Sequence, residues 1–534
     1  MDIMVKSKTI RVLVGIIFFC SLNINGQNKV IDRKIQYFFS DYFGQLDTGF
    51  TSTKNSSTTF LIDSSYNELI EEYKLLQYKG WISSRLFNDN WFKLSGKDYD
   101  ITIDPYDGLS LGHETSINEA VWSNERGLYF NARFGQKIKV HSYFQEGPIK
   151  PDPFIDAYIL KTRIKPGEGS VHFLDESGVY GKYVSFGGIE YKASKYVDVT
   201  LAHGKNFLGD GYRSIILSDF GPNYLYGKMD FHFGKKVNYT TIVAEFIDYD
   251  REETASVLRQ KKYGSYHYLD IAVSKKLHLA LYEAVIWAGD SATRNTLELN
   301  YLNPFVIIRP IEFDLGSPDK LLIGTSFKYI PTNNVTLYGQ FMLTEFVYSE
   351  LFAGTNSWRN KYALQGGAKF HNFKFMKNLF FQLEYNHIRP FTYNHRSPQT
   401  SFSNAGQPLA HPSGSNLKEG VIIANYKHKR WNMNVKSVYR FSGLEYSDSI
   451  AVGTDVLRSY NDRENDFGNV IGQGVPYQQF HNTMVLSYLV NPSNMMFFEA
   501  GVVNRHQIID GNDRQQNYIF IGLKTGITNK YYDF

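Results

Sequence analysis

The sequence has little cysteine and no long internal hydrophobic run. Its 534 residues contain one cysteine, Cys20, which lies within a predicted export signal, so the mature chain is expected to hold no thiol. Disulfides and thiolate metal sites are then excluded. Beyond the N-terminus no apolar run approaches the roughly 20 residues of a spanning helix. A membrane protein without such runs must hide its backbone hydrogen bonds in a closed sheet.

The chain also lacks a large excess of positive or negative charge. The chain carries 57 basic against 53 acidic residues, a net charge of +4. Nucleic-acid binding needs a clustered basic face, so no nucleic-acid partner is expected. Gly-x-Ser-x-Gly is absent, and His113-Glu114 lacks the second His of a zinc-protease helix. We expect no enzymatic activity and no cofactor, although a barrel lipase with Ser and His in partner positions stays an alternative.

No metal site is expected either. The carboxylates of Asp462, Glu464 and Asp466 have the spacing of a calcium loop. However, Phe467 stands where the sharp turn of such a loop requires Gly. A solvated outer loop is the better interpretation.

The N-terminus has the pattern of a signal peptide over 1–26. Lys6, Lys8 and Arg11 form its charged region, Val12 to Leu22 its apolar region, and Gly26 precedes the cleavage point. A retained anchor helix is the alternative, but the apolar stretch is too short to span. Acylation at Cys20 would need small residues before it, where this chain has two Phe.

Residues 27–97 are expected to form a helical periplasmic or plug region. Ser65 to Glu68 has the spacing of a capping box, and Gly80 is expected to stop the helix that follows. A second helix is expected over about 30–43. These helices could fill the barrel floor as a plug or dock below it as a cap; the plug is favoured.

The order of connections indicates the fold class. From about residue 99 to Phe534, short alternating strands are joined by connections that are tight, then long, then tight again. Outer-membrane barrels have this pattern, because their periplasmic turns are short and their external loops long. We therefore predict an all-β fold over 98–534, an 18-stranded antiparallel transmembrane β-barrel in the cell outer membrane, with lipid as one partner.

The strands are expected at 99–104, 125–134, 137–146, 186–193, 196–203, 225–234, 237–248, 264–274, 277–287, 322–330, 334–346, 360–371, 378–388, 418–428, 431–442, 478–489, 495–505 and 516–527. Long connections are expected at 105–124, 204–224 and 506–515, among others. Apolar residues should face lipid and polar ones the lumen. Phe341 and Leu343 are thus expected outside, and Gln340 and Glu384 inside.

The 203–214 connection is the strongest candidate for a binding element. Its three glycines allow tight folding or a close approach to a ligand, and its polar groups could hold hydroxyls or acidic sugars beside stacking aromatic rings. The expected glycan-binding residues here are Lys205, Asn206, Asp210, Tyr212 and Arg213. The alternative is a constriction loop whose charges pair with each other.

Two further connections have similar composition. One contributes Arg309 and Glu312, the other Arg389 and His411. We expect the 204–214 loop to fold into the lumen or mouth, anchored by 215–217, and to lie near Arg309 and Arg389. Lys205, Asn206, Asp210 and Arg213 would then form a cationic constriction with Arg309 and Arg389, with Asp210 as a partial counterweight. A lumen or mouth lined in this way suits acidic or polyhydroxylated glycans.

Five stretches carry a family resemblance: GKNFLGDGYRSIILSD, YLNPFVIIRPIEFDLGSPD, NHIRPFTYNH, GQPLAHPSGSN and the ending NKYYDF. They resemble the outer-membrane gliding motility protein RemB of gliding bacteria, and more distantly the Wzi capsule-assembly proteins. The resemblance covers nearly the whole barrel. One departure is Ser413, where the pattern has Leu.

The resemblance implies an 18-stranded barrel with a helical periplasmic plug, surface-polysaccharide binding, and a link to capsule assembly or gliding. A non-enzymatic barrel that binds capsular or exopolysaccharide is the leading hypothesis. A general porin and a scaffold subunit for motility or secretion machinery proteins are the alternatives.

Overall fold

The computed structural model describes residues 33–40, 50, 64–75, 77–78, 80–175, 177–248, 259–289, 297–305, 307–316, 319–373 and 376–534. The expected signal peptide lies outside the described residues. Within them, no helix is long and apolar enough to cross a membrane.

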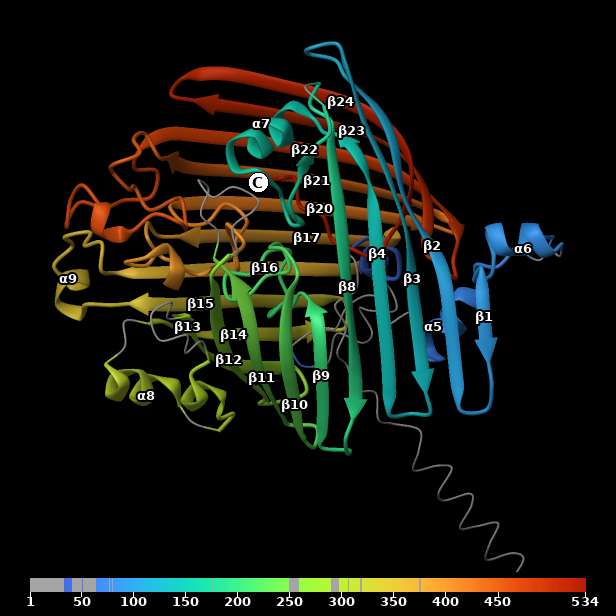
Figure 1. Cartoon of the computed structure of the whole chain (residues 1–534), viewed down its shortest axis with the longest axis horizontal. Helices are drawn as coiled ribbons and strands as arrows, with labels where there is room; N and C mark the ends of the chain where they lie inside the picture. Colours follow the sequence, from blue (N-terminus) through green and yellow to red (C-terminus); the bar gives the residue numbers. More distant parts are fainter. Residues whose placement is uncertain are drawn as a thin grey trace, which may run out of the picture.

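Eighteen antiparallel strands form a closed wall, because the last strand pairs with the first from Gly108–Lys524 to Glu114–Tyr518 (Figure 1). The wall strands are β2 (Tyr99–Glu114), β3 (Glu119–Phe134), β4 (Ile138–Lys150), β8 (Tyr180–Lys192), β9 (Val197–Gly204), β10 (Tyr224–Phe233), β11 (Val237–Ile247), β12 (Lys261–Ala272), β13 (Leu277–Ala288), β14 (Lys320–Thr332), β15 (Val335–Glu345), β16 (Lys361–Phe373), β17 (Met376–Ile388), β20 (Leu417–His428), β21 (Trp431–Leu444), β22 (Val475–Asn491), β23 (Met496–Ile509) and β24 (Asn512–Thr525).

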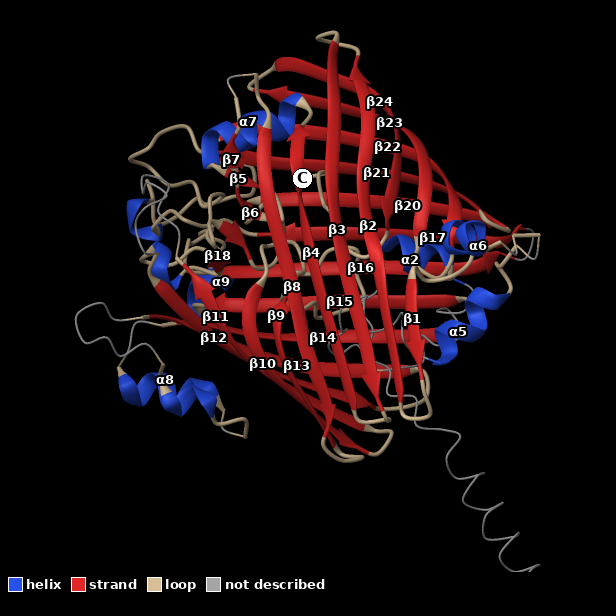
Figure 2. Cartoon of the chain, turned by 45° about the vertical axis from the view of Figure 1, so that its right-hand side comes forward, coloured by secondary structure: helices blue, strands red, loops and turns tan. Residues whose placement is uncertain are grey.

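The remaining elements are short. The helices are α2 (Arg33–Phe38), α5 (Ser64–Glu71), α6 (Trp81–Phe87), α7 (Pro153–Thr162), α8 (Ile308–Leu315), α9 (Tyr348–Phe352), η1 (Leu299–Leu302), η2 (Pro398–Thr400) and η3 (Tyr460–Asp462). The small strands are β1 (Phe92–Ser95), β5 (Ile164–Lys165), β6 (Gly169–Ser170), β7 (His172–Phe173), β18 (Ser403–Asn404) and β19 (Gln407–Pro408). Figure 2 shows α5, α6 and β1 at one end of the barrel, and α7 and α9 toward the other.

Alternation along the strands sets which side chains face the lumen. Gln340 and Glu384 are 5% and 4% exposed and bond to the backbone of the 205–223 loop, whereas Phe341 is 38% exposed. Leu343 is half-buried on the same face as Phe341. The predicted fold class and this register are confirmed.

Two predicted long connections are wrong. The 105–124 stretch is mostly strand, since β2 and β3 run on to a four-residue turn at 115–118. Likewise β23 and β24 extend to a two-residue turn at 510–511 in place of the 506–515 loop. In the second of these hairpins, Asn512 to Gln516 are polar on both faces. Apolar alternation therefore could not reveal that extension, because it arises only where one face meets lipid.

The N-terminal region differs in detail from expectation. The described helix near 30–43 is α2, and Gly80 is the N-cap of α6 rather than a helix stop. Strand β1 lies inside the stretch expected to be helical and pairs with β2. The α2 helix contacts the inner wall: Phe38 is fully buried with its ring 5.7 Å from Phe497.

Candidate functional site

The loop between β9 and β10, residues 205–223, crosses the lumen. The fully buried Ile215, Ile216 and Leu217 anchor it in an apolar cluster on the inner wall. The side-chain amide of Gln340 donates to the Leu208 carbonyl at 2.9 Å, while its oxygen accepts from the Ile215 amide at 3.0 Å. Gly209 has φ +117°, and a Cβ there would lie 2.2 Å from Gln340 Nε2. The predicted infolding of this loop is confirmed.

Arg213 joins this loop to the opposite wall and to the C-terminus. Its side chain is 1% exposed. Its Nε donates to Glu419 Oε1 at 3.0 Å, and its Nη1 lies 3.0 Å from Asp533 Oδ1. Burial would raise the pKa of the Asp533 carboxyl, but Arg213 and Lys436 beside it hold that pKa well below its usual range. The ion pair is therefore charged.

His411 completes this buried network as a neutral ring. Its Nδ1 accepts the Ser413 amide at 3.2 Å, so the proton is on Nε2, which donates to Glu419 Oε1 at 3.0 Å. Burial lowers the pKa of His411, and the attraction of Glu419 does not offset it. Ser413, the departure from the family pattern, accepts a hydrogen bond from Arg440.

The last nine residues, 526–534, form a tail that turns back into the barrel (Figures 1 and 2). The Tyr531 hydroxyl donates to Asp219 at 2.8 Å, and Lys530 lies 2.7 Å from Glu125. Burial would lower the pKa of Lys530, but Glu125 and Glu168 raise it well above its usual value. The Phe534 ring packs 5.2 Å from that of Phe220. The tail thus fills space that an open channel would leave to water.

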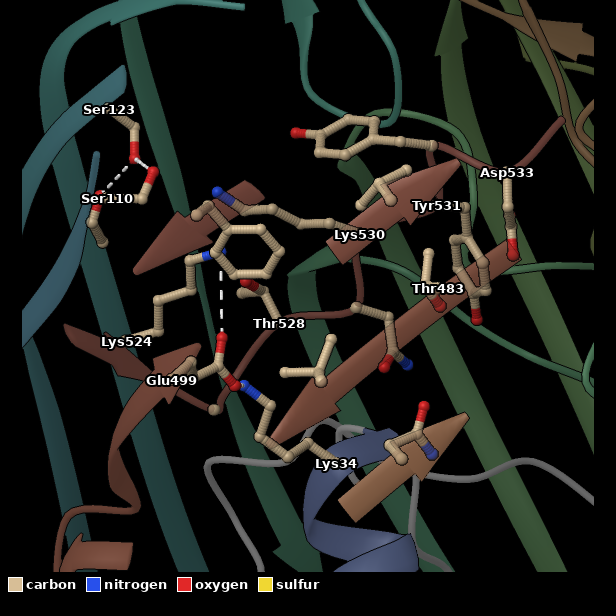
Figure 3. A pocket seen from close by; sticks show the side chains of 18 of the residues that line it. Lys34, Ser110, Ser123, Thr483, Glu499, Lys524, Thr528, Lys530, Tyr531 and Asp533 are labelled. Carbon is tan, nitrogen blue, oxygen red and sulfur yellow. Dashed lines mark hydrogen bonds and ion pairs between the residues drawn. The ribbon is translucent and has the colours of Figure 1, made fainter. Parts of the chain in front are cut away.

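A cavity of about 390 Å³ remains beside the tail (Figure 3). It is bounded by α2, the start of α7, the tail and inner faces of β2, β3 and β20–β24. Its cationic side chains are Arg33, Lys34, Lys150, Lys165, Lys436, Arg505, Lys524 and Lys530, against the acidic Glu125, Asp152, Glu499 and Asp533. Cations therefore outnumber carboxylates two to one in the lining.

Neutral polar groups fill the gaps between these charges. They include Ser110, Ser123, Asn425, Asn432, Asn434, Thr483, Ser487 and Thr528, with rings of Tyr106, Tyr212, Tyr518 and Tyr531. In Figure 3, Lys34 and Lys524 approach Glu499 from two sides. Lys34 bonds to it, while the Lys524 ammonium is 3.8 Å away, beyond hydrogen-bond distance.

Most of the expected site residues lie inside the barrel, with their polar groups bound to protein. Lys205 donates to the Gly167 carbonyl at 2.7 Å, and Asn206 contacts the Tyr224 hydroxyl at 3.3 Å. Asp210 lies 3.3 Å from Lys328. Tyr212, Arg213 and His411 belong to the network described above. Only Tyr212 among these six lines the larger cavity; Lys205 lines a smaller one of about 80 Å³.

The expected cationic constriction is wrong in two members, Arg309 and Arg389. Arg309 is 62% exposed and pairs with Glu312 at 2.8 Å on α8, outside the wall (Figure 2). Arg389 lies at the outer mouth, donating to the Asn360 carbonyl at 2.8 Å and so joining two loops. Loop composition does not encode the side of the wall on which a loop packs.

Sequence reasoning missed the cavity lining. Lys436, Thr483, Glu499 and Lys524 lie on inward positions of β21–β24, where alternation marks them only as lumen-facing. No local motif brings four strands and two chain ends together. Among the described residues, no cluster of three or more His, Cys, Asp or Glu could hold a metal ion.

The chain is similar in fold to solved outer-membrane proteins. Wzi of Escherichia coli, an outer-membrane protein involved in group 1 capsule assembly and a carbohydrate-binding β-barrel, superposes with a TM-score of 0.53 at 12% identity. The match covers 94% of this chain and 100% of Wzi. This chain is an outer-membrane β-barrel. OprD of Pseudomonas aeruginosa matches with a TM-score of 0.41 at 10% identity, over 82% of this chain and 96% of OprD. No family model and no curated protein matches the sequence.

Proposed function

We propose that this outer-membrane barrel binds surface polysaccharide, capsular or exopolysaccharide, without catalysing its conversion. The lining of the 390 Å³ cavity carries the proposal. That volume lies within the roughly 300–1,000 Å³ of small-ligand sites. Hydroxyl, amide and tyrosine side chains suit polyhydroxylated sugars, and the excess of cations favours sugars that bear carboxylates. The fold shared with the carbohydrate-binding Wzi supports the same class of ligand.

Lys524 and Lys436 are the proposed anion-binding groups. The side chain of Lys524 is 36% exposed, and within the described part of the chain no carboxylate is hydrogen-bonded to it. A ligand carboxylate could therefore replace the distant Glu499. Lys436 is 2.6 Å from Asp533, and its charge is partly neutralised there. Asn434 and Thr483 line the wall beside these lysines and can meet sugar hydroxyls.

The infolded loop has a shaping role in this proposal. Tyr212 offers its ring to the cavity, while Lys205, Asn206, Asp210, Arg213 and His411 hold the loop and tail against the wall. Contacts of α2 with Tyr212 and Glu499 support the plug interpretation of the N-terminal region. Arg389 fixes loops above the cavity, and Arg309 and Glu312 lie outside it.

The test uses the intact barrel refolded in detergent. Calorimetry should detect binding of a uronate-bearing oligosaccharide, and Lys524→Gln should weaken it about fivefold, or about 1 kcal/mol, because one attractive charge in a wet lumen is lost. Binding of a neutral oligosaccharide should be unaffected by Lys524→Gln. Lys275→Gln, on an exposed turn, is the matched control.

Two outcomes separate the function from the site. If no oligosaccharide binds the intact barrel, polysaccharide binding is wrong. If acidic oligosaccharides bind but Lys524→Gln changes nothing, binding occurs elsewhere.

The filled lumen disfavours a general porin, which should conduct in planar bilayers. A role in gliding rests on the sequence resemblance alone, and no contact of the described residues supports a scaffold for motility or secretion proteins.

A further inference from the structure

The outer face of β12 and β13 carries a polar group where lipid is expected. His267 and Glu283 are register partners, and His267 Nδ1 lies 2.8 Å from Glu283 Oε1. Their neighbours Tyr266 and Ala284 belong to the apolar cluster inside the lumen. Since successive side chains alternate between faces, His267 and Glu283 point outward. The fully buried Ser265 lies two residues from His267, on the same face.

These groups lie within the apolar belt of the wall. The register partner of Glu283 on β14 is Ile323, which is 45% exposed, and Leu281 on β13 is 59% exposed. Ionisable side chains on the lipid face of a barrel are destabilising at this depth. Yet His267 is only 5% exposed. Something other than lipid therefore covers the pair.

The cover is the connection between β13 and β14, whose described residues 297–305 and 307–316 we term the cap. Glu283 Oε2 accepts the Ile308 amide at 3.1 Å, and Ile308 is 1% exposed. Tyr301 packs 5.1 Å from Trp287. The Tyr239 hydroxyl on the outer wall donates a hydrogen bond to the Pro304 carbonyl. Both Figures 1 and 2 draw α8 outside the barrel.

The other side of the cap is strongly apolar. Leu299, Phe305, Ile307 and Phe313 are 72%, 70%, 68% and 77% exposed. These values are among the largest for apolar side chains of the described chain. Exposure of such an apolar patch to water would be unfavourable. Contact with lipid would be favourable, as it is for the exposed Ile323 and Leu281 of the outer wall.

The backbone of the cap is suited to a place with little water. Three backbone amides of the cap donate hydrogen bonds to side-chain oxygens. The Asn300 amide donates to Glu298, the Phe305 amide to Asn303, and the Ile308 amide to Glu283. Unpaired amides are costly in lipid. Arg309 and Glu312 pair with each other on α8. A helix with both an apolar face and charged groups belongs at the membrane–water boundary.

We infer that the cap is a membrane-embedded part of the barrel surface. It shields His267 and Glu283 from lipid, and it presents Leu299, Phe305, Ile307 and Phe313 to the acyl chains of the membrane. The cap is thus a lipid-contacting element and not part of an external loop available to polysaccharide.

Site-directed spin labelling in liposomes tests this placement. The full chain with Cys20→Ser would carry a single label at Phe313→Cys, with Ile307→Cys as an independent second position. Both side chains are exposed, so labels should not disturb packing. Leu281→Cys on the wall is the lipid control, and Asn461→Cys on an exposed loop is the water control.

Labels at 313 and 307 should collide with oxygen more than with a water-soluble nickel complex, as at 281. If they instead match 461 and favour the nickel complex, the cap is exposed to water and the inference is wrong. That result would also be the one expected if the patch docks a protein partner, because these liposomes contain only the barrel.

Discussion

Arg213 and Asp533 form an ion pair with 3.0 Å between Nη1 and Oδ1, although 320 residues separate them along the chain. Arg213 comes from the loop that crosses the lumen, and Asp533 is the penultimate residue. Both side chains are 1% exposed. The pair therefore holds the two segments that fill the barrel against each other, with Glu419 of β20 as the shared wall contact.

Replacing Arg213 by Met should destabilise the packed lumen. Glu419 would remain buried without its cation, and Asp533 would keep only Lys436. Breaking a buried ion pair in this way costs about 3–5 kcal/mol. Hydrogen exchange of 205–222 and thermal unfolding in detergent would measure the effect. Adding Glu419→Gln should recover part of the loss, while Lys275→Met serves as the surface control. Unchanged exchange in Arg213→Met would contradict the bracing role.

The neutral His411 should give the fold a pH dependence below its ordinary pKa of 6.5. Burial lowers the pKa of His411 in the folded barrel, so below that pH the unfolded chain binds a proton that the folded one does not. Stability should fall with pH by up to about 1.4 kcal/mol per unit. His411→Gln keeps a donor for Glu419 but cannot titrate. Urea unfolding of both proteins between pH 7.5 and about 5 should show curves that separate toward acid; parallel curves would refute this.

Removing residues 531–534 should open the lumen. The tail contributes the Tyr531 contact with Asp219 and the packing of Phe534 on Phe220, and it lines both cavities. Planar-bilayer recordings should show larger and more frequent conducting events for the truncated barrel than for the full chain. Phe534→Leu keeps the tail and should stay near the full-chain value. Equal conductance of the truncated and full chains would mean that the loop alone seals the lumen.

Alternation predicted the wall because it reflects a local constraint. Phe341 and Gln340 occupy opposite faces as expected, since lipid and lumen impose opposite polarity on neighbouring residues of one strand. Beyond the lipid-facing part of a strand this constraint is absent, and the strand ends could not be predicted there. Strand β24 begins at Asn512, in a stretch that is polar on both faces. The infolding of 205–223 was predictable from its glycines and its apolar Ile215.

The sequence by itself determined the barrel, its strand number and the infolded loop, because these follow from residue-by-residue contact with lipid, water or backbone. Only the tertiary structure decided what the charges do. Arg309 and Arg389 have the same local chemistry as Arg213, yet one lies outside the wall, one joins loops at the mouth, and one is buried. Their roles depend on partners distant in sequence, such as Asp533 for Arg213, and closure of the barrel alone brings those partners together.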